Sequence, residues 1–431
     1  MATRDSLDPA SGEAILERSL GPLAECWGRE NGQLSIDGQP LSARLPRTPA
    51  YVYNRRCLDA ALAGLRAALP DSLGIHYAIK ANPFPPLVRH LAAGVEGIEG
   101  FDCASLAEMQ LAYEVSSAGQ HLSIAGPAKS RAELRYAIDH DVTINAESVG
   151  EIERIMAEAQ LSGRRAQVAL RVNPPFALKG SGMHMGGGSR PFGIDSETIP
   201  ILLDQRDRLD AGGIDLVGLH LFAGSQSLDV EAIESTLAAW VALLEDWQRA
   251  CRYTPDELTI GPGLGVAYHP GDRPLAIDRL RPAFARLATR LAALGEAGGK
   301  RIATRLEIGR FLVAGAGLYL TRVVDRKVSR GTTFLVCDGG MHHHLALSGN
   351  LGAVLRRNWP LVAADRLDAA AVERVDLAGP LCTPLDVLGR QQSLPTLGTG
   401  DWIAVLQSGA YGASASPGDF LSRERPDEYL I

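Results

Sequence analysis

The sequence predicts an α/β fold in which a (β/α)8 barrel is joined to a second, antiparallel β domain. Two observations carry the barrel: short apolar runs alternate with longer Ala- and Leu-rich stretches, and there are eight such runs. Repeated strand–helix units give a parallel sheet, and eight of them are what a closed barrel needs. A third observation, alternating and turn-rich sequence beyond the last run, predicts the β domain. An open doubly wound sheet is the alternative to the barrel.

The eight apolar runs set the expected strands. They are GIHYAIK (74–80), GIEGFD (97–102), HLSIAG (121–126), VTINA (142–146), VALRVN (168–173), IDLVGLHL (214–221), ELTIG (257–261) and TRLEIG (304–309). Amphipathic stretches such as SLAEMQLAYEV and SVGEIERIMAEAQ lie between them. We expect the barrel to occupy residues 49–310.

The antiparallel β domain is expected from three later segments, 317–337, 373–390 and 401–411, which alternate and carry turn residues. We assign residues 311–431 to it. The N-terminal residues 1–48 are less patterned, and we expect them to join the same domain, with the barrel inserted between the two chain ends.

Composition excludes several functional classes. The 431 residues are 46% hydrophobic and 22% charged with a net charge of −7, and no basic block is present to bind nucleic acid. No apolar run is long enough to span a membrane, and residues 1–14 lack the apolar core of a signal peptide. The six scattered cysteines contain no CxxC pair, which favours a reducing cytoplasm without a zinc site or a disulfide framework. The adjacent histidines of MHHHL (341–345) point apart on regular structure, so no metal site is expected.

Residues that can take part in catalysis or ligand binding stand at the C-terminal ends of the runs. They are Lys80, Asp102, Gly126, Glu147, Arg171, His220, Gly261 and Glu307. Barrel enzymes place their active sites at this end of the strands. The alternative is that these residues are polar only because strands usually end at the surface. A lysine, a glutamate and a glycine loop at the same end of one barrel favour an active site.

Two of these residues suit one cofactor. A lysine at a strand end can bond covalently to a carbonyl or an aldehyde cofactor, although a buried lysine can also be structural. Glu307, in LEIGR, could face a pyridine nitrogen and keep it protonated, which makes pyridoxal phosphate a strong electron sink. An ordinary ion pair with Arg310 is the alternative for Glu307.

Three further motifs could complete such a site. In TIGPGLG (259–265) the N–H groups of Gly261, Gly263 and Leu264 could cradle a phosphate, because Pro262 has none. GPLCTPLDVLG (379–389) places Cys382 among turn residues, as an acid, a nucleophile or inert packing. GAYG (409–412) presents Tyr411, which could equally be a packed aromatic with its hydroxyl satisfied.

Taken in order, YAIKAN, GFDCASLAEMQLA, LRVNP, the glycine loop, LEIGR, GPLCTPLDVL and GAYG resemble the fold-type III pyridoxal-phosphate decarboxylases of the ornithine and diaminopimelate type. These are barrels like that of alanine racemase with a C-terminal β domain. The resemblance runs from about Thr48 to the end of the chain.

The resemblance implies pyridoxal 5′-phosphate as cofactor and a role for each matching residue. It makes Lys80 the lysine that bonds to the cofactor and Glu307 the partner of the pyridine nitrogen. It implies supporting roles for Asp102 and Arg171, proton return to Cα by Cys382 or Lys80, and phosphate binding by Ser225, Gly261, Gly263, Leu264, Gly265, Gly309, Arg310 and Tyr411. It also implies a homodimer with shared active sites, in which the segment holding Cys382 and Asp386 crosses from the partner subunit.

The chain departs from the family at two positions. Where diaminopimelate enzymes read H-x-H-I-G-S-Q, this chain reads HLFAGSQ (220–226), so either His220 or Phe222 covers the cofactor ring; we favour His220. Ornithine and diaminopimelate enzymes have an acidic residue after the cysteine, and here it is Thr383. Losing a charged partner for an ammonium disfavours a free diamino acid such as ornithine or lysine.

A third departure is LKGSGMHMGGGSRPFGID (178–195), which resembles the subgroup of siderophore and other secondary-metabolite pathways. That subgroup acts on amino acids already attached to citrate or a carrier protein. Lys179, His184 and Arg190 could meet an anionic group of the substrate, alongside Thr383 and Asp386. The MGGG stretch is expected to be a mobile or phosphate-binding loop, with a plain flexible loop as the alternative.

The sequence therefore predicts decarboxylation of an amino acid, or of an amino-acid moiety linked to a citryl group or a carrier, in siderophore or secondary-metabolite biosynthesis. The alternatives are a diaminopimelate decarboxylase of lysine biosynthesis, an amino-acid racemase and a regulatory protein without catalysis. A racemase would be expected to face the pyridine nitrogen with an arginine, and Glu307 argues against it.

Overall fold

The computed structural model describes residues 10–94, 97–178, 180–269, 271–349, 351 and 357–431. The chain forms two compact units, and each is described by itself. One comprises the N-terminal region up to Ala61, Ala267–Pro274 and Leu312–Ile431, and is called the β unit. The other comprises Leu62–Val266 and Leu275–Phe311, and is called the barrel unit.

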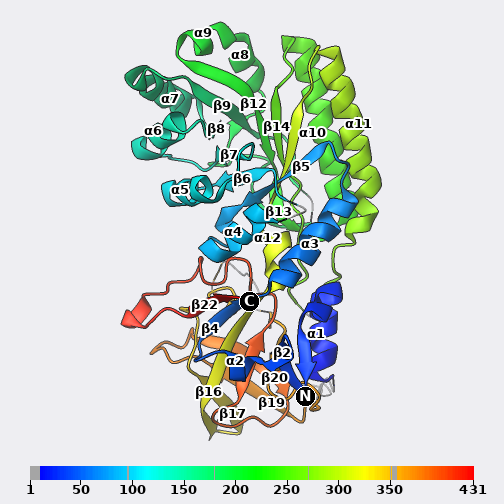
Figure 1. Ribbon diagram of the computed structural model, residues 1–431, viewed down its shortest axis with the longest axis vertical. Coiled ribbons are helices and arrows are strands. Elements are labelled where there is room, and N and C mark those ends of the chain that lie inside the picture. Colours follow the sequence, from blue (N-terminus) through cyan, green and yellow to red (C-terminus); the bar gives the residue numbers. More distant parts are fainter. Residues whose placement is uncertain (1–9, 95–96, 179, 270, 350, 352–356) are drawn as a thin grey trace. The chain divides into compact units, whose positions relative to one another are not determined.

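Eight parallel strands close the barrel of the barrel unit (Figure 1). They are β5 (Leu73–Ala78), β6 (Gly100–Cys103), β7 (His121–Ile124), β8 (Thr143–Ala146), β9 (Ala166–Asn173), β12 (Ile214–Phe222), β14 (Glu257–Gly261) and β15 (Ala303–Ile308). The pairing runs β9-β12-β14-β15-β5-β6-β7-β8, and β8 pairs with β9 again. The closure confirms the barrel over the open sheet, and each of the eight apolar runs overlaps one strand.

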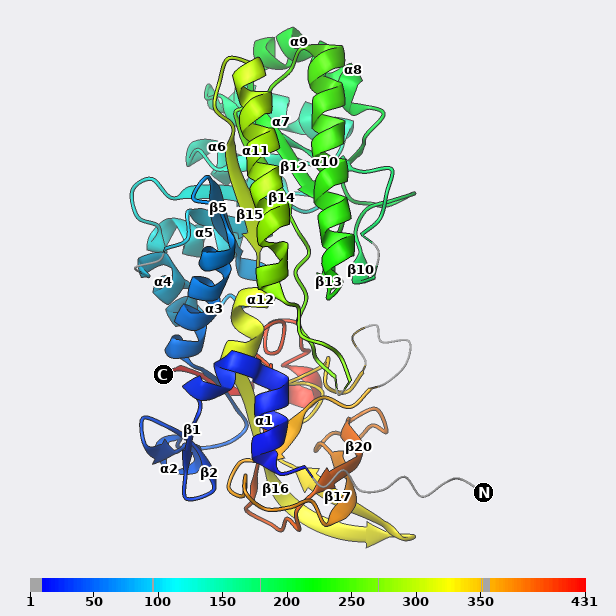
Figure 2. The same cartoon turned by 90° about the vertical axis from the view of Figure 1, so that its right-hand side faces the viewer.

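Helices follow the strands around the outside. They are α3 (Arg55–Ala68), α4 (Pro85–Ala93), α5 (Leu106–Val115), α6 (Arg131–Asp139), α7 (Val149–Ser162), α8 (Ile199–Asp204), α9 (Arg206–Ala211), α10 (Val230–Cys251), α11 (Arg281–Ala297) and the short α12 (Arg310–Val313). Ser105, Ser130 and Ser148 cap the first turns of α5, α6 and α7 through their hydroxyls. The long helices α10 and α11 pack side by side (Figure 2).

An extra layer covers the ends of β9 and β12. Strand β10 (Ser181–His184) pairs antiparallel with β13 (Gly224–Ser227), which follows β12, and β11 (Ile194–Asp195) pairs with β9. The glycine stretch after β10 is anchored, because Asn173 Nδ2 donates to the Gly188 carbonyl at 3.0 Å and the Gly187 N–H donates to Asn173 Oδ1 at 3.3 Å. The expectation of a mobile or phosphate-binding MGGG loop stays a prediction, and these two bonds are the contacts that such a loop would have to keep or break.

The β unit is built around one mixed sheet. Its strands are β4 (Ala50–Tyr53), β16 (Gly317–Ser329), β17 (Thr332–Cys337), β18 (Leu361–Ala363), β19 (Glu373–Ala378), β20 (Val387–Leu394), β21 (Trp402–Val405) and β22 (Asp427–Leu430). Most pairs are antiparallel, as expected, but β17–β19 and β4–β22 are parallel. Both parallel pairs join strands that are far apart in sequence, which local alternation cannot reveal.

The N-terminal region adds small elements to the β unit. They are α1 (Gly12–Leu20), η1 (Gly21–Cys26), β1 (Gly28–Glu30), β2 (Gln33–Ile36), β3 (Gln39–Pro40) and α2 (Leu41–Arg44), with η5 (Phe420–Ser422) near the C-terminus. All six cysteines lie in the described part, and all are free thiols. In the described residues, no helix has the length and apolar character needed to cross a membrane.

Candidate active site

Lys80 stands where strand β5 ends. The chain leaves β5 in a single 3-10 turn, η2 (Ile79–Ala81), which turns the lysine toward two buried carboxylates. Its Nζ atom lies 2.7 Å from Oε1 of Glu307 and 3.3 Å from Oδ2 of Asp102. The lysine side chain is 35% exposed, whereas the two carboxylates are 2% and 0% exposed. The amine is therefore reachable from solvent, with negative charge held behind it.

The two carboxylates differ in protonation. Burial alone would raise the pKa of Glu307, but Lys80 and His220 outweigh it and hold that pKa well below its usual range. Burial, followed by the negative charge of Glu307, raises the pKa of Asp102 to about 8. At neutral pH Glu307 is ionised and Asp102 is protonated. Ser123 also donates to Oδ1 of Asp102 at 3.1 Å.

His220 and Phe222 are two residues apart on β12 and therefore face the same side of the sheet. Their rings are parallel within 1°, with centroids 6.4 Å apart. His220 is buried and its Nε2 lies 3.0 Å from Oε2 of Glu307, while Phe222 is half-buried, with its ring centroid 5.6 Å from Lys80 Nζ. The histidine is thus tied to Glu307, and the phenylalanine lies beside the lysine amine.

Arg171 lies against the same phenylalanine. Its Nη1 donates to Oε1 of Glu147 at 2.6 Å, and its guanidinium lies 5.4 Å from the Phe192 ring and 5.8 Å from the Phe222 ring. Glu147 also accepts the N–H groups of Gly126 at 2.6 Å and Gly193 at 2.9 Å. Burial raises the pKa of Glu147, but Arg171 and Lys129 outweigh it and lower that pKa.

Three positions of the loop after β14 leave no room for a side chain. A Cβ on Gly261 would lie 2.0 Å from the Phe222 ring, and one on Gly265 would lie 2.7 Å from the Ser227 carbonyl. Gly263 has φ +74°, and its Cβ would meet the Gly224 carbonyl at 2.7 Å. Gln226 ties down the end of this loop by exchanging two hydrogen bonds with the backbone of Val266.

These features fit pyridoxal phosphate. A solvent-reachable amine suits the aldehyde, an ionised buried carboxylate suits a protonated pyridine nitrogen, and a glycine-rich loop suits a phosphate. The N–H of Gly265 is already donated to the Ser227 carbonyl at 2.9 Å, so the expected phosphate contact would fall to the other residues of the loop. Leu264 forms a bridge to Ser227, which sets the loop beside β13 and its half-buried Ser225. Gly309 and Arg310 follow β15, and a Cβ on Gly309 would lie 3.0 Å from the Ala81 side chain. The barrel unit therefore brings most of the expected cofactor residues together.

The remaining expected residues belong to the β unit. Cys382 is exposed, and the half-buried Thr383 accepts the Leu385 N–H through its hydroxyl at 3.3 Å. Asp386 is 3% exposed and uses both oxygens for the N–H groups of Met341, at 2.6 Å, and Leu381, at 2.8 Å. These bonds give Asp386 a role in organising its loop, and its expected contact with substrate stays a prediction. Tyr411 is half-buried and adopts a left-handed φ of +56°.

The segment 178–195 is only partly informative. Lys179 lies outside the described residues. The backbone of His184 pairs with Gly224 between β10 and β13, and Arg190 is exposed.

The sequence analysis did not identify three residues that contact the expected site residues: Phe192, Ser123 and Lys129. Ser123 could have been found, because it alternates with His121 on one face of β7; the others depend on loop packing.

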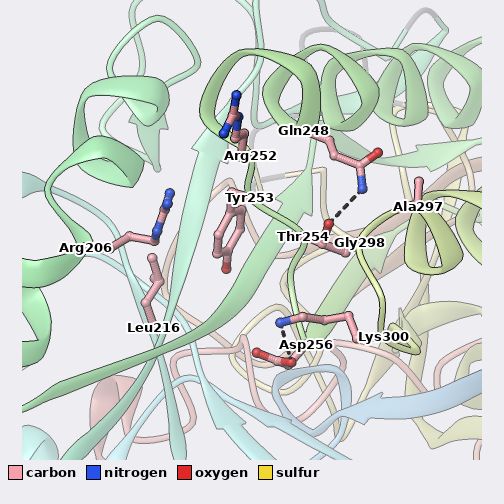
Figure 3. A pocket seen from close by; sticks show the side chains of 10 residues that line it. All are labelled: Arg206, Leu216, Gln248, Arg252, Tyr253, Thr254, Asp256, Ala297, Gly298 and Lys300. Atoms are coloured by element: carbon pink, nitrogen blue, oxygen red, sulfur yellow. Dashed lines mark hydrogen bonds and ion pairs between the residues drawn. The ribbon is translucent and has the colours of Figure 1, made fainter.

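A cleft with a volume of about 630 Å³ lies at the opposite end of the barrel strands (Figure 3). Two pairs of its polar side chains bond to each other, with Lys300 Nζ 2.7 Å from Asp256 Oδ1 and Gln248 Nε2 2.7 Å from Thr254 Oγ1. In barrels this end of the strands serves stability, and the chemistry is found at the Lys80 end.

Comparison with known proteins agrees with the site. The family model of the pyridoxal-dependent decarboxylases, pyridoxal binding domain, matches residues 56–314. The solved structure of AQ1208 from Aquifex aeolicus superposes with a TM-score of 0.81 at 27% identity, covering 96% of this chain and 94% of its own.

Three curated relatives are similar over nearly their full lengths. The L-glutamyl-[BtrI acyl-carrier protein] decarboxylase of Niallia circulans is 32% identical, covering 92% of each chain. The 2-[(L-alanin-3-ylcarbamoyl)methyl]-2-hydroxybutanedioate decarboxylase of Staphylococcus aureus is 28% identical over 88% of this chain and 92% of its own. A diaminopimelate decarboxylase of Deinococcus radiodurans is 34% identical over 89% and 90%. On these matches the chain belongs to the pyridoxal-dependent decarboxylases.

Proposed function

We propose that this protein decarboxylates an amino-acid moiety that is already linked to a larger group, with pyridoxal phosphate as cofactor. The observation that carries the decarboxylase part is the ionised carboxylate of Glu307, 2.7 Å from Lys80 Nζ. A carboxylate that keeps its charge can hold a pyridine nitrogen protonated, whereas the arginine expected of a racemase would not. The retained Lys80 and Glu307 also speak against a regulatory protein that has lost its chemistry.

Lys80, Glu307 and His220 have separate roles in the proposed reaction. When bound, pyridoxal phosphate supplies an electron sink for the pair of electrons left behind as CO2 departs. Lys80 holds the cofactor through its amine and can then move a proton at the substrate's Cα. Glu307 holds the proton on the pyridine nitrogen. Because an ionised carboxylate only accepts hydrogen bonds, His220 must donate to Glu307 from Nε2, which fixes the carboxylate's position.

The contacts favour Phe222 over His220 as the residue that covers the cofactor ring. His220 is fully buried and committed to Glu307, while Phe222 lies beside both Lys80 and the glycine loop. This reverses our sequence-based preference for His220. An aromatic face can stack on a pyridine ring without any hydrogen bond, so phenylalanine can replace the histidine of the family.

A linked substrate is supported by two features. Thr383 offers no charge to the distal ammonium of a free diamino acid, and Arg190 is exposed on the segment that resembles the secondary-metabolite subgroup. The relative from Niallia circulans is named for a glutamyl group on an acyl-carrier protein, and the relative from Staphylococcus aureus for an alanin-3-ylcarbamoyl group joined to a 2-hydroxybutanedioate. By this proposal the protein serves siderophore or other secondary-metabolite biosynthesis.

We also propose a homodimer with shared active sites, located in the cytoplasm. Cys382 is exposed, and apolar side chains near it are exposed as well: Leu385 by 55%, Phe420 by 43% and Leu421 by 51%. Arg423 donates to the Pro380 carbonyl at 3.2 Å, which ties these two loops together. A partner subunit would cover this apolar surface and take Cys382 to its own active site as a proton donor. The six free thiols are typical of a reducing compartment.

A panel of free and linked substrates tests the proposal. The protein loaded with pyridoxal phosphate would be incubated with ornithine, lysine, diaminopimelate, glutamate and diaminopropionate, and with citryl-linked and carrier-linked forms of the last two. Mass spectrometry would follow the loss of CO2, with Lys80→Ala as the blank. We expect turnover of linked substrates. Turnover of free diaminopimelate instead would favour lysine biosynthesis, which the relative from Deinococcus radiodurans keeps as the second candidate.

A further inference from the structure

The inside of the barrel is polar from one end to the other. Side chains of strands that are not neighbours meet there: His121 Nε2 of β7 lies 3.0 Å from Glu257 Oε2 of β14, just as His220 of β12 meets Glu307 of β15. His121 Nε2 also lies 2.9 Å from Thr143 Oγ1 of β8. Barrel interiors are usually filled by branched apolar side chains, so this polar interior calls for a physical reason.

His76 links the two groups. It is the register partner of Glu307 on β15 and of Gly100 on β6, and Gly100 is in turn the partner of His121. The rings of His76 and His121 stack with centroids 5.1 Å apart. A Cβ on Gly100 would lie 2.7 Å from Nε2 of His76, so only glycine leaves room for this pair of imidazoles.

Five buried nitrogen atoms on the histidines and the asparagine of this interior have no hydrogen-bond partner among the described residues. They are Nδ1 and Nε2 of His76, Nδ1 of His121, Nδ1 of His220 and Nδ2 of Asn145. A buried polar atom without a partner destabilises the fold, and proteins commonly satisfy such atoms with ordered internal water. Since the five atoms belong to β5, β7, β8 and β12, which enclose the same interior, shared water molecules can satisfy them.

The two ends of this polar interior differ in exposure. At the N-terminal end of the strands, the side chains of His121 and Glu257 are 15% and 22% exposed. At the other end, Glu307 and His220 are 2% and 1% exposed and lie behind Lys80. The interior therefore begins at solvent and ends at the active-site carboxylate.

We propose that the barrel interior binds a chain of ordered water molecules which, with His121, His76 and His220, carries protons from the N-terminal end of the barrel to Glu307 and Lys80. The direction follows from the hydrogen bonds: His220 gives Nε2–H to Glu307 and leaves Nδ1 as an acceptor for water. His76 is kept neutral by burial and by the nearby His121, which lower its pKa, with Arg305, Glu307 and His220 also near it. A neutral imidazole can take a proton at one nitrogen and release one from the other.

The use of this route rests on the proposed function. Decarboxylation breaks the bond between Cα and the carboxylate carbon, releases CO2 and forms a Cα–H bond, so it consumes one proton per turnover. The group that gives this proton must regain one from solvent. A proton taken up at the N-terminal end of the barrel enters from the side opposite the substrate.

A high-resolution crystal structure tests the water chain without any substrate. We expect ordered waters within hydrogen-bonding distance of both His76 nitrogens and of Nδ1 of His220. A dry interior would overturn the proposal, whether or not the protein is a decarboxylase. The unliganded full chain is sufficient for this measurement.

Proton transfer is tested by a pH jump on the protein loaded with pyridoxal phosphate, followed through the absorbance of the cofactor. In His76→Phe the uptake of a proton is expected to be about tenfold slower, because the ring keeps its volume and loses both nitrogens. His140→Phe is the matched control, since His140 stacks on Tyr136 at the end of α6, away from the barrel interior. His121→Leu is the second variant if His76→Phe fails to fold. Unchanged rates in a folded, loaded variant would overturn the route, and this readout needs no turnover.

Discussion

The Nζ atom of Lys80 lies 2.7 Å from Oε1 of Glu307, although 227 residues separate the two along the chain. The contact joins the solvent-reachable amine to a carboxylate whose pKa is held low. Asp102, the second carboxylate beside the lysine, has a raised pKa and stays protonated. One negative charge thus balances one lysine, and the second buried carboxylate adds no net charge at neutral pH.

Replacing Glu307 by glutamine tests the electron-sink argument. In Glu307→Gln the side chain would keep its shape but could not hold a protonated pyridine nitrogen, so kcat should fall by roughly 10²–10³-fold. The absorbance of the bound cofactor should also shift. Glu99→Gln, on a surface carboxylate paired with Arg66, serves as the control and should match the wild type. A glutamine variant with near-normal kcat would contradict the assignment of Glu307.

Asp102 predicts a pH dependence of stability in the cofactor-free protein. Its pKa is raised from 3.8 to about 8, so between these values the folded protein keeps a proton that the unfolded chain releases. The contribution of Asp102 to stability is therefore full below about pH 4 and is lost as the pH rises toward about 8. Thermal midpoints of wild type and Asp102→Asn, measured from pH 5 to pH 8.5, should show the wild type losing more stability with rising pH. Parallel curves would refute the raised pKa.

Asp386 predicts a structural effect in the Cys382 loop. Asparagine can no longer present two acceptor oxygens to the N–H groups of Met341 and Leu381, so one donor stays unsatisfied, at about 1–3 kcal/mol. The thermal midpoint of Asp386→Asn should fall. Asp419→Asn removes an exposed partner of Arg425 and should change the midpoint little. Equal midpoints for the two variants would show that the loop does not depend on Asp386.

Thr383 predicts a shift in substrate preference. Thr383→Glu places a charge where ornithine and diaminopimelate enzymes have one, and an ammonium partner of this kind changes kcat/KM by about tenfold or more. The ratio of kcat/KM for ornithine over a linked substrate should rise. Thr383→Gln adds similar volume without charge and should leave the ratio unchanged. If both variants raise the ratio equally, size rather than charge decides specificity.

The sequence alone was sufficient to predict the closed barrel and the meeting of Lys80 and Glu307 at one end of its strands. Each of the eight apolar runs overlaps one of the eight strands, because strand–helix alternation is a local pattern. Lys80, Asp102, His220 and Glu307 stood at strand ends in the sequence, and parallel strands bring such ends to one edge. The order of the motifs then indicated the family.

Only the tertiary structure could show the contacts made across the barrel and between distant loops. The commitment of His220 to Glu307, which leaves Phe222 beside Lys80, depends on how two separate strands face each other. The loop role of Asp386, the anchoring of the glycine stretch by Asn173 and the parallel pairs of the mixed sheet depend likewise on residues far apart in sequence. So does the stacking of His76 on His121 across Gly100. The spacing of residues along a chain records which side of a strand they occupy, but the partner opposite is set by the closure of the whole sheet.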